Sequence, residues 1–71
     1  MWMYKLFFSS ESDKKDAEFW IIHNVGYFEF DGCDGKEPHQ LKFYTSARLP
    51  DSEQATIRRE TRATSYLMEK L

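Results

Sequence analysis

The chain has 71 residues and a formal net charge of −2, with 41% hydrophobic, 31% charged and 17% aromatic residues. A chain of this length buries one small core, so we expect a single compact domain over residues 1–71. This composition excludes a disordered chain, no apolar run is long enough to span a bilayer, and one cysteine excludes a disulfide framework and a Cys-rich zinc module.

Strand-like periodicity dominates the first 31 residues. Residues 2–9 alternate, with Trp2, Tyr4, Leu6 and Phe8 on one face and Met3, Lys5 and Phe7 on the other. The polar segment 9–16 predicts a loop, residues 17–24 are rich in β-formers, and residues 27–31 alternate again. Between these last two strands, residues 23–26 form either a tight hairpin or a bulge at Gly26 in one long strand, and the spacing does not separate the two.

The second half predicts one more strand and then a helix. Turn-forming residues fill positions 31–38, and residues 41–47 alternate as a strand. After Pro50, a capping box formed by Asp51 and Gln54 indicates a helix from residue 51 to residue 71. The expected fold is therefore α+β, with an antiparallel sheet of three to four strands in the order β-β-β-β-α and one C-terminal helix packed on one face.

Large apolar side chains occur on both faces of the predicted strands, which a single helix cannot cover. One helix shields one face of a four-stranded sheet, so several aromatic rings are expected to stay uncovered. An apolar face of this kind on a small protein usually marks an interface, although loops folding over it would also account for it.

Charge is unevenly distributed along the chain. Residues 1–40 contain eight acidic and four basic residues, whereas residues 41–71 contain four acidic and six basic residues, including all four arginines. This asymmetry favours docking to another protein, but a solvated helix face is the commoner reason for a run of charges.

No arrangement of residues predicts catalysis, a metal site or a cofactor. His23 and His39 could each approach Cys33, but nothing in their spacing brings a nucleophile, a base and an orienting group together. The acids of the 31–38 turn lack the ligand pattern of a calcium loop, and no phosphate-binding glycine loop is present. We therefore expect a protein that is not an enzyme.

Nucleic-acid binding is the alternative function. The segment Arg58-Arg59-Glu60-Thr61-Arg62 resembles the basic start of the final helix in double-stranded RNA-binding domains, which implies phosphate contacts by its three arginines. The resemblance covers about one and a half helical turns. Single-stranded nucleic acid stacked on the aromatic sheet face is a second route, with rings such as Trp20 or Tyr44.

The sequence favours a small cytoplasmic protein-protein interaction module, of a kind that a phage or mobile element could encode to modulate or inhibit a host complex. Its partner is another protein, with self-association as a further possibility, and no membrane is involved. Aromatic and arginine side chains most often dominate binding energy. The expected anchors on the sheet face are Phe7, Trp20, Tyr27 and Tyr44, and those on the helix face are Arg58, Arg62 and Tyr66.

Overall fold

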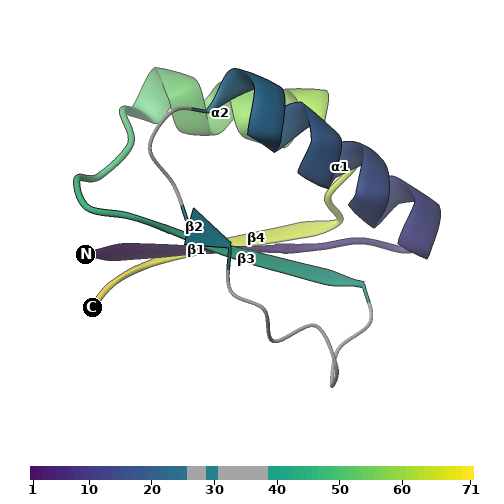
Figure 1. The fold of residues 1–71 in the computed structure, drawn as a ribbon, viewed down its shortest axis with the longest axis horizontal. Coiled ribbons are helices and arrows are strands. Elements are labelled where there is room, and N and C mark those ends of the chain that lie inside the picture. Colours follow the sequence, from purple (N-terminus) through teal and green to yellow (C-terminus); the bar gives the residue numbers. More distant parts are fainter. Residues whose placement is uncertain (26–28, 31–38) are drawn as a thin grey trace.

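The computed structural model describes residues 1–25, 29–30 and 39–71. Two helices and four strands alternate in a β-α-β-β-α-β order (Figure 1). Their bounds are β1 (Trp2–Phe7), α1 (Glu11–Asn24), β2 (Glu29–Phe30), β3 (Gln40–Thr45), α2 (Asp51–Glu60) and β4 (Ser65–Lys70).

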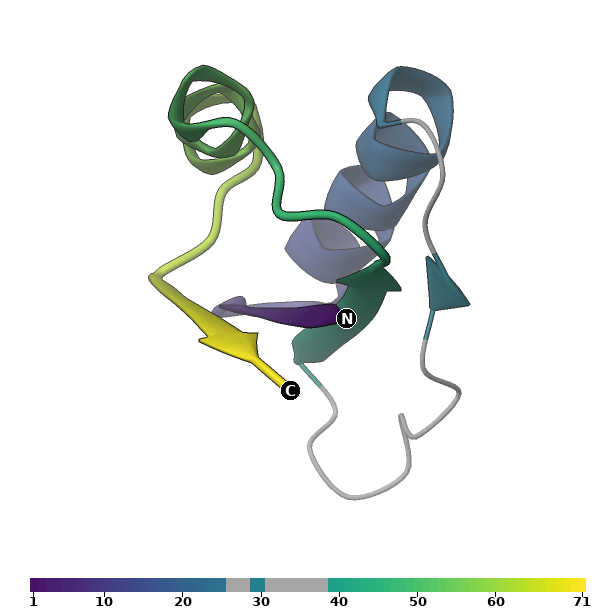
Figure 2. The same ribbon diagram turned by 90° about the vertical axis from the view of Figure 1, so that its left-hand side faces the viewer.

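The strands form one antiparallel sheet in the order β2-β3-β1-β4. Each helix connects two strands that have a third strand between them, which is the split β-α-β, or ferredoxin-like, connectivity. Both helices lie side by side on the same face of the sheet, and no helix of the described residues covers the other face (Figures 1 and 2). The fold is thus a two-layer α+β domain.

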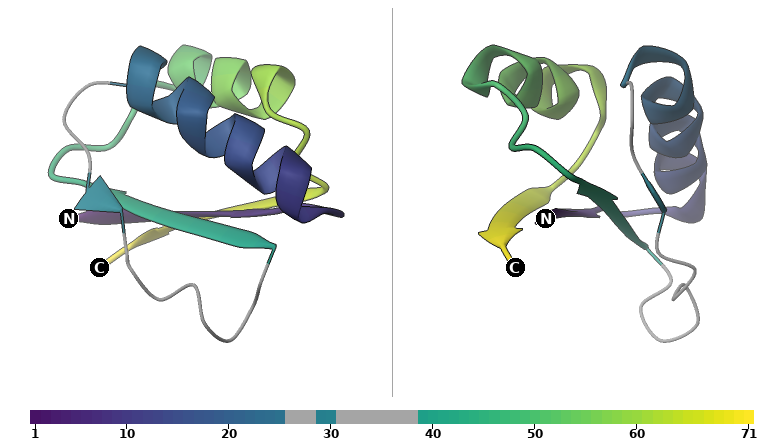
Figure 3. Two further views of the ribbon diagram at one scale, coloured as in Figure 1. Left: turned by 45° about the vertical axis from the view of Figure 1, so that its right-hand side comes forward. Right: turned by 60° about the vertical axis from the view of Figure 1, so that its left-hand side comes forward.

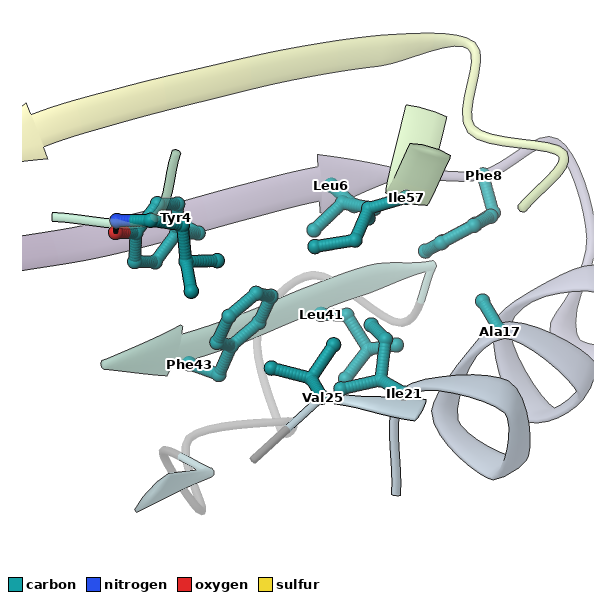
Figure 4. Packing of buried hydrophobic residues seen from close by; sticks show 10 residues of the cluster. Tyr4, Leu6, Phe8, Ala17, Ile21, Val25, Leu41, Phe43 and Ile57 are labelled. Atoms are coloured by element: carbon teal, nitrogen blue, oxygen red, sulfur yellow. Dashed lines mark hydrogen bonds between the residues drawn. The ribbon is translucent and has the colours of Figure 1, made fainter. Parts of the chain in front are cut away.

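The core lies between the helices and the helix-facing side of β1 and β3. Every second side chain of these two strands points towards the helices. There it packs against inward-facing residues of α1 and α2, and against one residue each from the segment after α1 and the segment before α2 (Figure 4). The buried cluster consists of Tyr4, Leu6, Phe8, Ala17, Ile21, Val25, Leu41, Phe43, Leu49 and Ile57.

Residues 11–24 form a helix, so the expected strand at residues 17–24 and the expected loop at residues 9–16 are wrong. The side chain of Ser10 caps the helix by accepting a hydrogen bond from the backbone N–H of Asp13 at 3.1 Å. Acidic residues in the first turn stabilise the helix, because their negative charges lie near the positive end of the helix dipole. Ala17 and Ile21, one turn apart, then face the core. A capped start and a buried stripe outweigh the β-propensity of the residues that follow.

The hairpin and the long bulged strand expected around residues 23–26 are both wrong as far as the described residues extend. His23 and Asn24 belong to α1, and Val25 ends the helix in extended backbone, with its N–H bonded to the carbonyl of Ile21. Gly26, Tyr27 and residues 31–38, where the sequence predicts a turn that contains Cys33, lie outside the described residues.

The single C-terminal helix expected over residues 51–71 is wrong, because α2 ends at Glu60 and the chain returns as β4. Thr61 has extended backbone angles, and both its N–H and its hydroxyl donate to the carbonyl of Ile57, at 3.0 and 2.7 Å. The following residues pair with the edge of β1 that β3 leaves free. As a strand, this segment satisfies its backbone hydrogen bonds by pairing with β1 and packs Tyr66 and Met68 against the core. These interactions take the place of those that a longer helix would have made.

The capping box expected for this helix is also wrong, although α2 does begin at Asp51. Pro50 holds the cap position, and its carbonyl accepts the N–H groups of Glu53 and Gln54 at 3.0 Å each. The amide of Gln54 instead donates to the carbonyl of Leu49 at 2.8 Å and accepts the hydroxyl of Tyr66 at 2.6 Å. Gln54 therefore ties α2 to the preceding connection and to β4.

Tyr4 on β1 joins the sheet to the connection between β3 and α2. Its buried ring stacks on Phe43, with the ring centroids 4.8 Å apart. Its hydroxyl accepts the N–H of Leu49 at 2.9 Å and lies 3.0 Å from the hydroxyl of Thr45. Since Thr45 donates its only hydroxyl proton to the carbonyl of Ala47 at 2.6 Å, Tyr4 is the donor to Thr45.

Replacing Tyr4 by Phe tests this chain of hydrogen bonds. Y4F leaves the buried N–H of Leu49 without an acceptor, so we expect a loss of about 1–3 kcal/mol in the free energy of unfolding, measured by urea denaturation. The matched control T56V removes an exposed hydroxyl from α2 and should change the free energy by less than about 0.5 kcal/mol. Equal effects of the two substitutions would contradict the role given to Tyr4.

Candidate functional site

The outward side of α1 carries two large apolar side chains in solvent. Phe19 is 66% exposed and Ile22, one turn further along, is 51% exposed. The ring of His23 lies against that of Phe19, with the centroids 4.2 Å apart, while its Nδ1 is 2.8 Å from the carbonyl of Phe19. We call the surface formed by Phe19, Trp20, Ile22 and His23 the α1 surface.

A groove of about 390 Å³ adjoins the α1 surface, between α1 and the end of α2. The two helices lie next to one another above the sheet (Figure 3). Three carboxylates, one guanidinium and two aromatic rings are among the groove's lining groups, which makes it acidic and partly apolar. These lining residues are Asp13, Asp16, Glu60, Arg62, Phe19 and Trp20.

Trp20 is the one expected sheet-face anchor that the structure places elsewhere. It lies on α1, where its half-buried side chain packs against the core and also lines the groove. The prediction that it belongs to the sheet is wrong because residues 17–24 are helical. Trp20 therefore lies beside Phe19 and not beside Phe7 or Tyr44.

Phe7 and Tyr44 lie on the sheet face that points away from the helices, and Tyr27 lies outside the described residues. The register pairs Phe7 with Gln40 and Tyr44 with Met3, so the two rings are at opposite ends of the β1–β3 ladder. Both side chains are half-buried. They frame the centre of this face without contributing to the α1 surface.

Between these rings, two lysines face one another. Lys5 on β1 and Lys42 on β3 are direct partners across the strands. Like charges placed opposite one another destabilise a sheet. Leu67 on β4 is the partner of Lys5 on its other side, so the row is basic in the middle of the sheet and apolar at its β4 edge.

The three residues expected on a common helix face are divided between two places. The guanidinium of Arg58 lies 5.3 Å from the centre of the Tyr66 ring, so α2 and β4 bring these two together. Arg62 lies after α2 and points to α1, where its Nη1 is 3.7 Å from Oδ1 of Asp13. The continuous helix that would have joined Arg62 to Arg58 and Tyr66 does not exist.

This arrangement differs from the one implied by the resemblance to double-stranded RNA-binding domains. The basic segment is the last turn of a ten-residue helix followed by a strand, and not the start of a final helix. Arg59 contacts Glu60 at 3.5 Å, so the three arginines have different partners. They do not form one row of phosphate ligands.

The histidines and carboxylates that the structure describes do not gather into a metal centre. No group of three or more His, Cys, Asp or Glu side chains in this part of the chain could hold a metal ion. Nδ1 of His39 lies 3.7 Å from Oε2 of Glu11, and His23 lies on α1. The expected approach of either histidine to Cys33 is not tested, because Cys33 is outside the described ranges. Over the same ranges, none of the helices has the length and apolar character needed to cross a bilayer.

Sequence reasoning missed Phe19 and Ile22 as surface residues because it assigned them to a strand. The signal that would have found them is the Ser10-x-x-Asp13 spacing, a helix-start pattern that precedes the apolar run. With a helix in place, Ala17 and Ile21 share one face, so Phe19 and Ile22 must point elsewhere.

Tyr66 supplies a test of the packing between α2 and β4. Burial, followed by the nearby Tyr4, raises the pKa of Tyr66 from 10.0 to about 12, although Arg58 and Arg48 act in the opposite direction. The protonated hydroxyl is also the form that donates to Gln54. Because the folded-state pKa is above the unfolded value, the stabilisation is complete below pH 10 and is lost as the pH rises towards 12.

We therefore predict that the difference in unfolding free energy between wild type and Y66F is constant below pH 10. It should shrink between pH 10 and pH 12, as measured by urea denaturation at a series of pH values. A difference that stays constant through this range would contradict the buried, hydrogen-bonded state of Tyr66.

Comparisons with known proteins assign no family to this chain. No protein-family model, no curated protein and no solved structure matches it. Connectivity alone does not imply function. The functional argument therefore depends on the surfaces described above.

Proposed function

We propose that this chain is a non-enzymatic protein-binding module that docks its partner on the α1 surface. The observation that supports this is the exposure of Phe19 and Ile22 on a helix whose opposite side is already in the core. Residues 19–22 of α1 are all apolar, so the second half of this helix carries apolar side chains on more than one side, and an apolar patch left in solvent usually marks an interface. The folded chain covers one side of α1, and a partner would cover the other.

The energy available on this surface is large for so small a protein. Burying a side chain of this size contributes about 1.5–3 kcal/mol, and Phe19 and Ile22 lie one turn apart, so one partner segment can cover both. The rings of Phe19 and His23 contact one another, so they lose less conformational entropy on binding than free side chains would. The α1 surface thus combines apolar area with partial pre-organisation.

Charge indicates the chemistry of the partner. Asp13, Asp16 and Glu60 line the groove beside Phe19, and the indole of Trp20 is one of its walls. Arg62 contacts Asp13 and Arg59 contacts Glu60, so the carboxylates exceed the guanidinium groups by one. An aromatic ring and nearby carboxylates both attract a cation. The partner we propose is a protein segment with apolar side chains over Phe19 and Ile22 and a lysine or arginine directed to the groove.

The residues expected on the open sheet face have a weaker claim. Phe7 and Tyr44 are half-buried in the folded chain, whereas Phe19 is two-thirds exposed. The role of a phage or mobile-element modulator of a host complex stays a prediction, because it depends on the size of the chain and not on any surface.

Selection from a displayed library of random peptides tests the α1 surface while the natural partner is unidentified. Peptides enriched on the wild type should combine apolar residues with lysine or arginine. Their affinity should fall about 30-fold or more for the double variant F19S/I22S, which is the effect of losing an interface hot spot. The matched control F7S changes an aromatic side chain on the opposite face of the domain and should leave the affinity unchanged.

Two results would contradict the proposal. If the peptides bound F19S/I22S as tightly as the wild type, the α1 surface would not be the binding site. If they lost affinity only for F7S, the binding site would be on the sheet face. Circular dichroism of each variant separates loss of binding from loss of fold.

Single-stranded nucleic acid on the open sheet face is the second candidate, and Lys5 in the middle of that face favours it. Phosphate could contact the ammonium group of Lys5 while bases stack on Phe7 and Tyr44. This hypothesis predicts an oligonucleotide affinity that falls steeply with salt, with a slope lowered by about 1 in K5Q. No gel shift at low salt would exclude it, whereas an apolar docking surface is much less sensitive to salt.

A further inference from the structure

One edge of the sheet has no neighbour among the described strands. β4 is the last strand in the order β2-β3-β1-β4, and its six residues pair only with β1. Figure 2 shows β4 in yellow at one side of the sheet, with the short β2 on the opposite side. Within the described ranges, the β4 edge is therefore the longer of the two edges.

Alternate residues of β1 form their backbone hydrogen bonds with opposite neighbouring strands, and this alternation shows which backbone groups of β4 point outward. The N–H of Phe8 donates to His39, next to β3, so even-numbered residues of β1 bond towards β3 and odd-numbered ones towards β4. The bond from the N–H of Leu71 to the carbonyl of Met1 agrees with this phase. In β4 the odd-numbered residues thus bond to β1, and the outward N–H and C=O groups belong to Tyr66, Met68 and Lys70.

Apolar side chains accompany these outward backbone groups. Leu67 is 46% exposed on the sheet face away from the helices, and Leu71 and Met1, which pair at the end of the strand, are 62% and 59% exposed. β4 contains no proline, and its two charged residues, Glu69 and Lys70, are confined to its end. Natural edge strands usually carry such protection, because an unprotected edge pairs with another strand.

We infer that β4 pairs with β4 of a second copy of this chain, antiparallel and centred on Leu67. An antiparallel pair of identical strands is related by a two-fold axis, so one edge serves as both halves of the interface. In this register Leu67 lies opposite Leu67 of the second copy, in a pair without backbone bonds where side chains approach most closely. Tyr66 lies opposite Met68 of the second copy, and these are the residues whose backbone groups point outward.

The side chains distinguish this register from its neighbour. Centring on Leu67 brings Ser65 opposite Glu69 of the second copy, so a hydroxyl can donate to a carboxylate, and no like charges within the strand oppose one another. Shifting the axis to Met68 also matches the backbone groups, but it places Leu67 opposite the carboxylate of Glu69. The Leu67 register covers apolar surface with apolar surface, which favours it.

The product is a continuous eight-stranded sheet with all helices on one side, because paired residues share a face. The contact involves one short strand from each copy, which is at the small end of stable interfaces. We therefore expect a reversible dimer whose fraction rises with protein concentration. The α1 surface lies on the helix layer and does not take part, so this inference is independent of the proposed function.

Cysteine cross-linking tests the register directly. In a C33S background, L67C should form a disulfide-linked dimer under mild oxidation, because the two Cα atoms of such a pair lie within disulfide reach. The matched control E69C adds an exposed cysteine to the same strand and face, but it meets Ser65 and not itself. Its dimer yield should be about tenfold lower, and the double variant S65C/E69C should restore cross-linking.

Sedimentation of the wild type completes the test. It should show a monomer–dimer equilibrium that L67K shifts towards monomer, with circular dichroism verifying that L67K stays folded. Equal cross-linking of L67C and E69C would overturn the register, since it would indicate random collision. A wild type that is monomeric at every concentration would overturn the dimer itself.

Discussion

The side chain of Tyr4 connects parts of the chain that are distant in sequence. Its ring stacks on Phe43 of the neighbouring strand, and its hydroxyl links the end of β3 to the segment that leads into α2. This hydrogen-bond chain fixes where α2 starts, and Gln54 then attaches the same helix to Leu49 and to Tyr66. A buried phenol with both of its hydrogen-bonding roles satisfied favours one arrangement over its alternatives, because each unmade bond would leave a polar group in the core.

Once α2 is held on this side, both helices occupy one face of the sheet, and the uncovered groups follow from that layering (Figures 1 and 2). α1 contributes Ala17 and Ile21 to the core and keeps Phe19 and Ile22 outside. β4 closes one side of β1, and no described strand pairs with its own outer edge. The two interaction surfaces proposed for this chain are thus on different layers of the domain, and a small protein of this kind could bind itself and a partner at the same time.

Sequence patterns predicted part of the fold and none of the α1 surface apart from Trp20. The reason for success or failure differs between elements. Alternation in β1 and β3 separated Tyr4 and Phe43 from Phe7 and Tyr44 correctly, because period-two burial is a local property of a strand. It failed at residues 17–24, where four β-forming residues follow a helix cap at Ser10 that was interpreted as part of a loop. It failed again after Glu60, since the choice between more helix and a fourth strand depends on β1 having a free edge. No local pattern carries that information, and the proposed docking residues Phe19 and Ile22 were missed because the helix that presents them was taken for a strand.

The central claim is that α1 presents Phe19 and Ile22 to solvent while Ala17 and Ile21 are buried. Nuclear magnetic resonance with a soluble paramagnetic relaxation agent measures this residue by residue, at a protein concentration low enough to keep the chain monomeric. The account predicts strong relaxation enhancement of the Phe19 ring and the Ile22 methyl groups, with the methyl groups of Ile21 and Ile57 protected. Equal protection of Ile21 and Ile22 would contradict it.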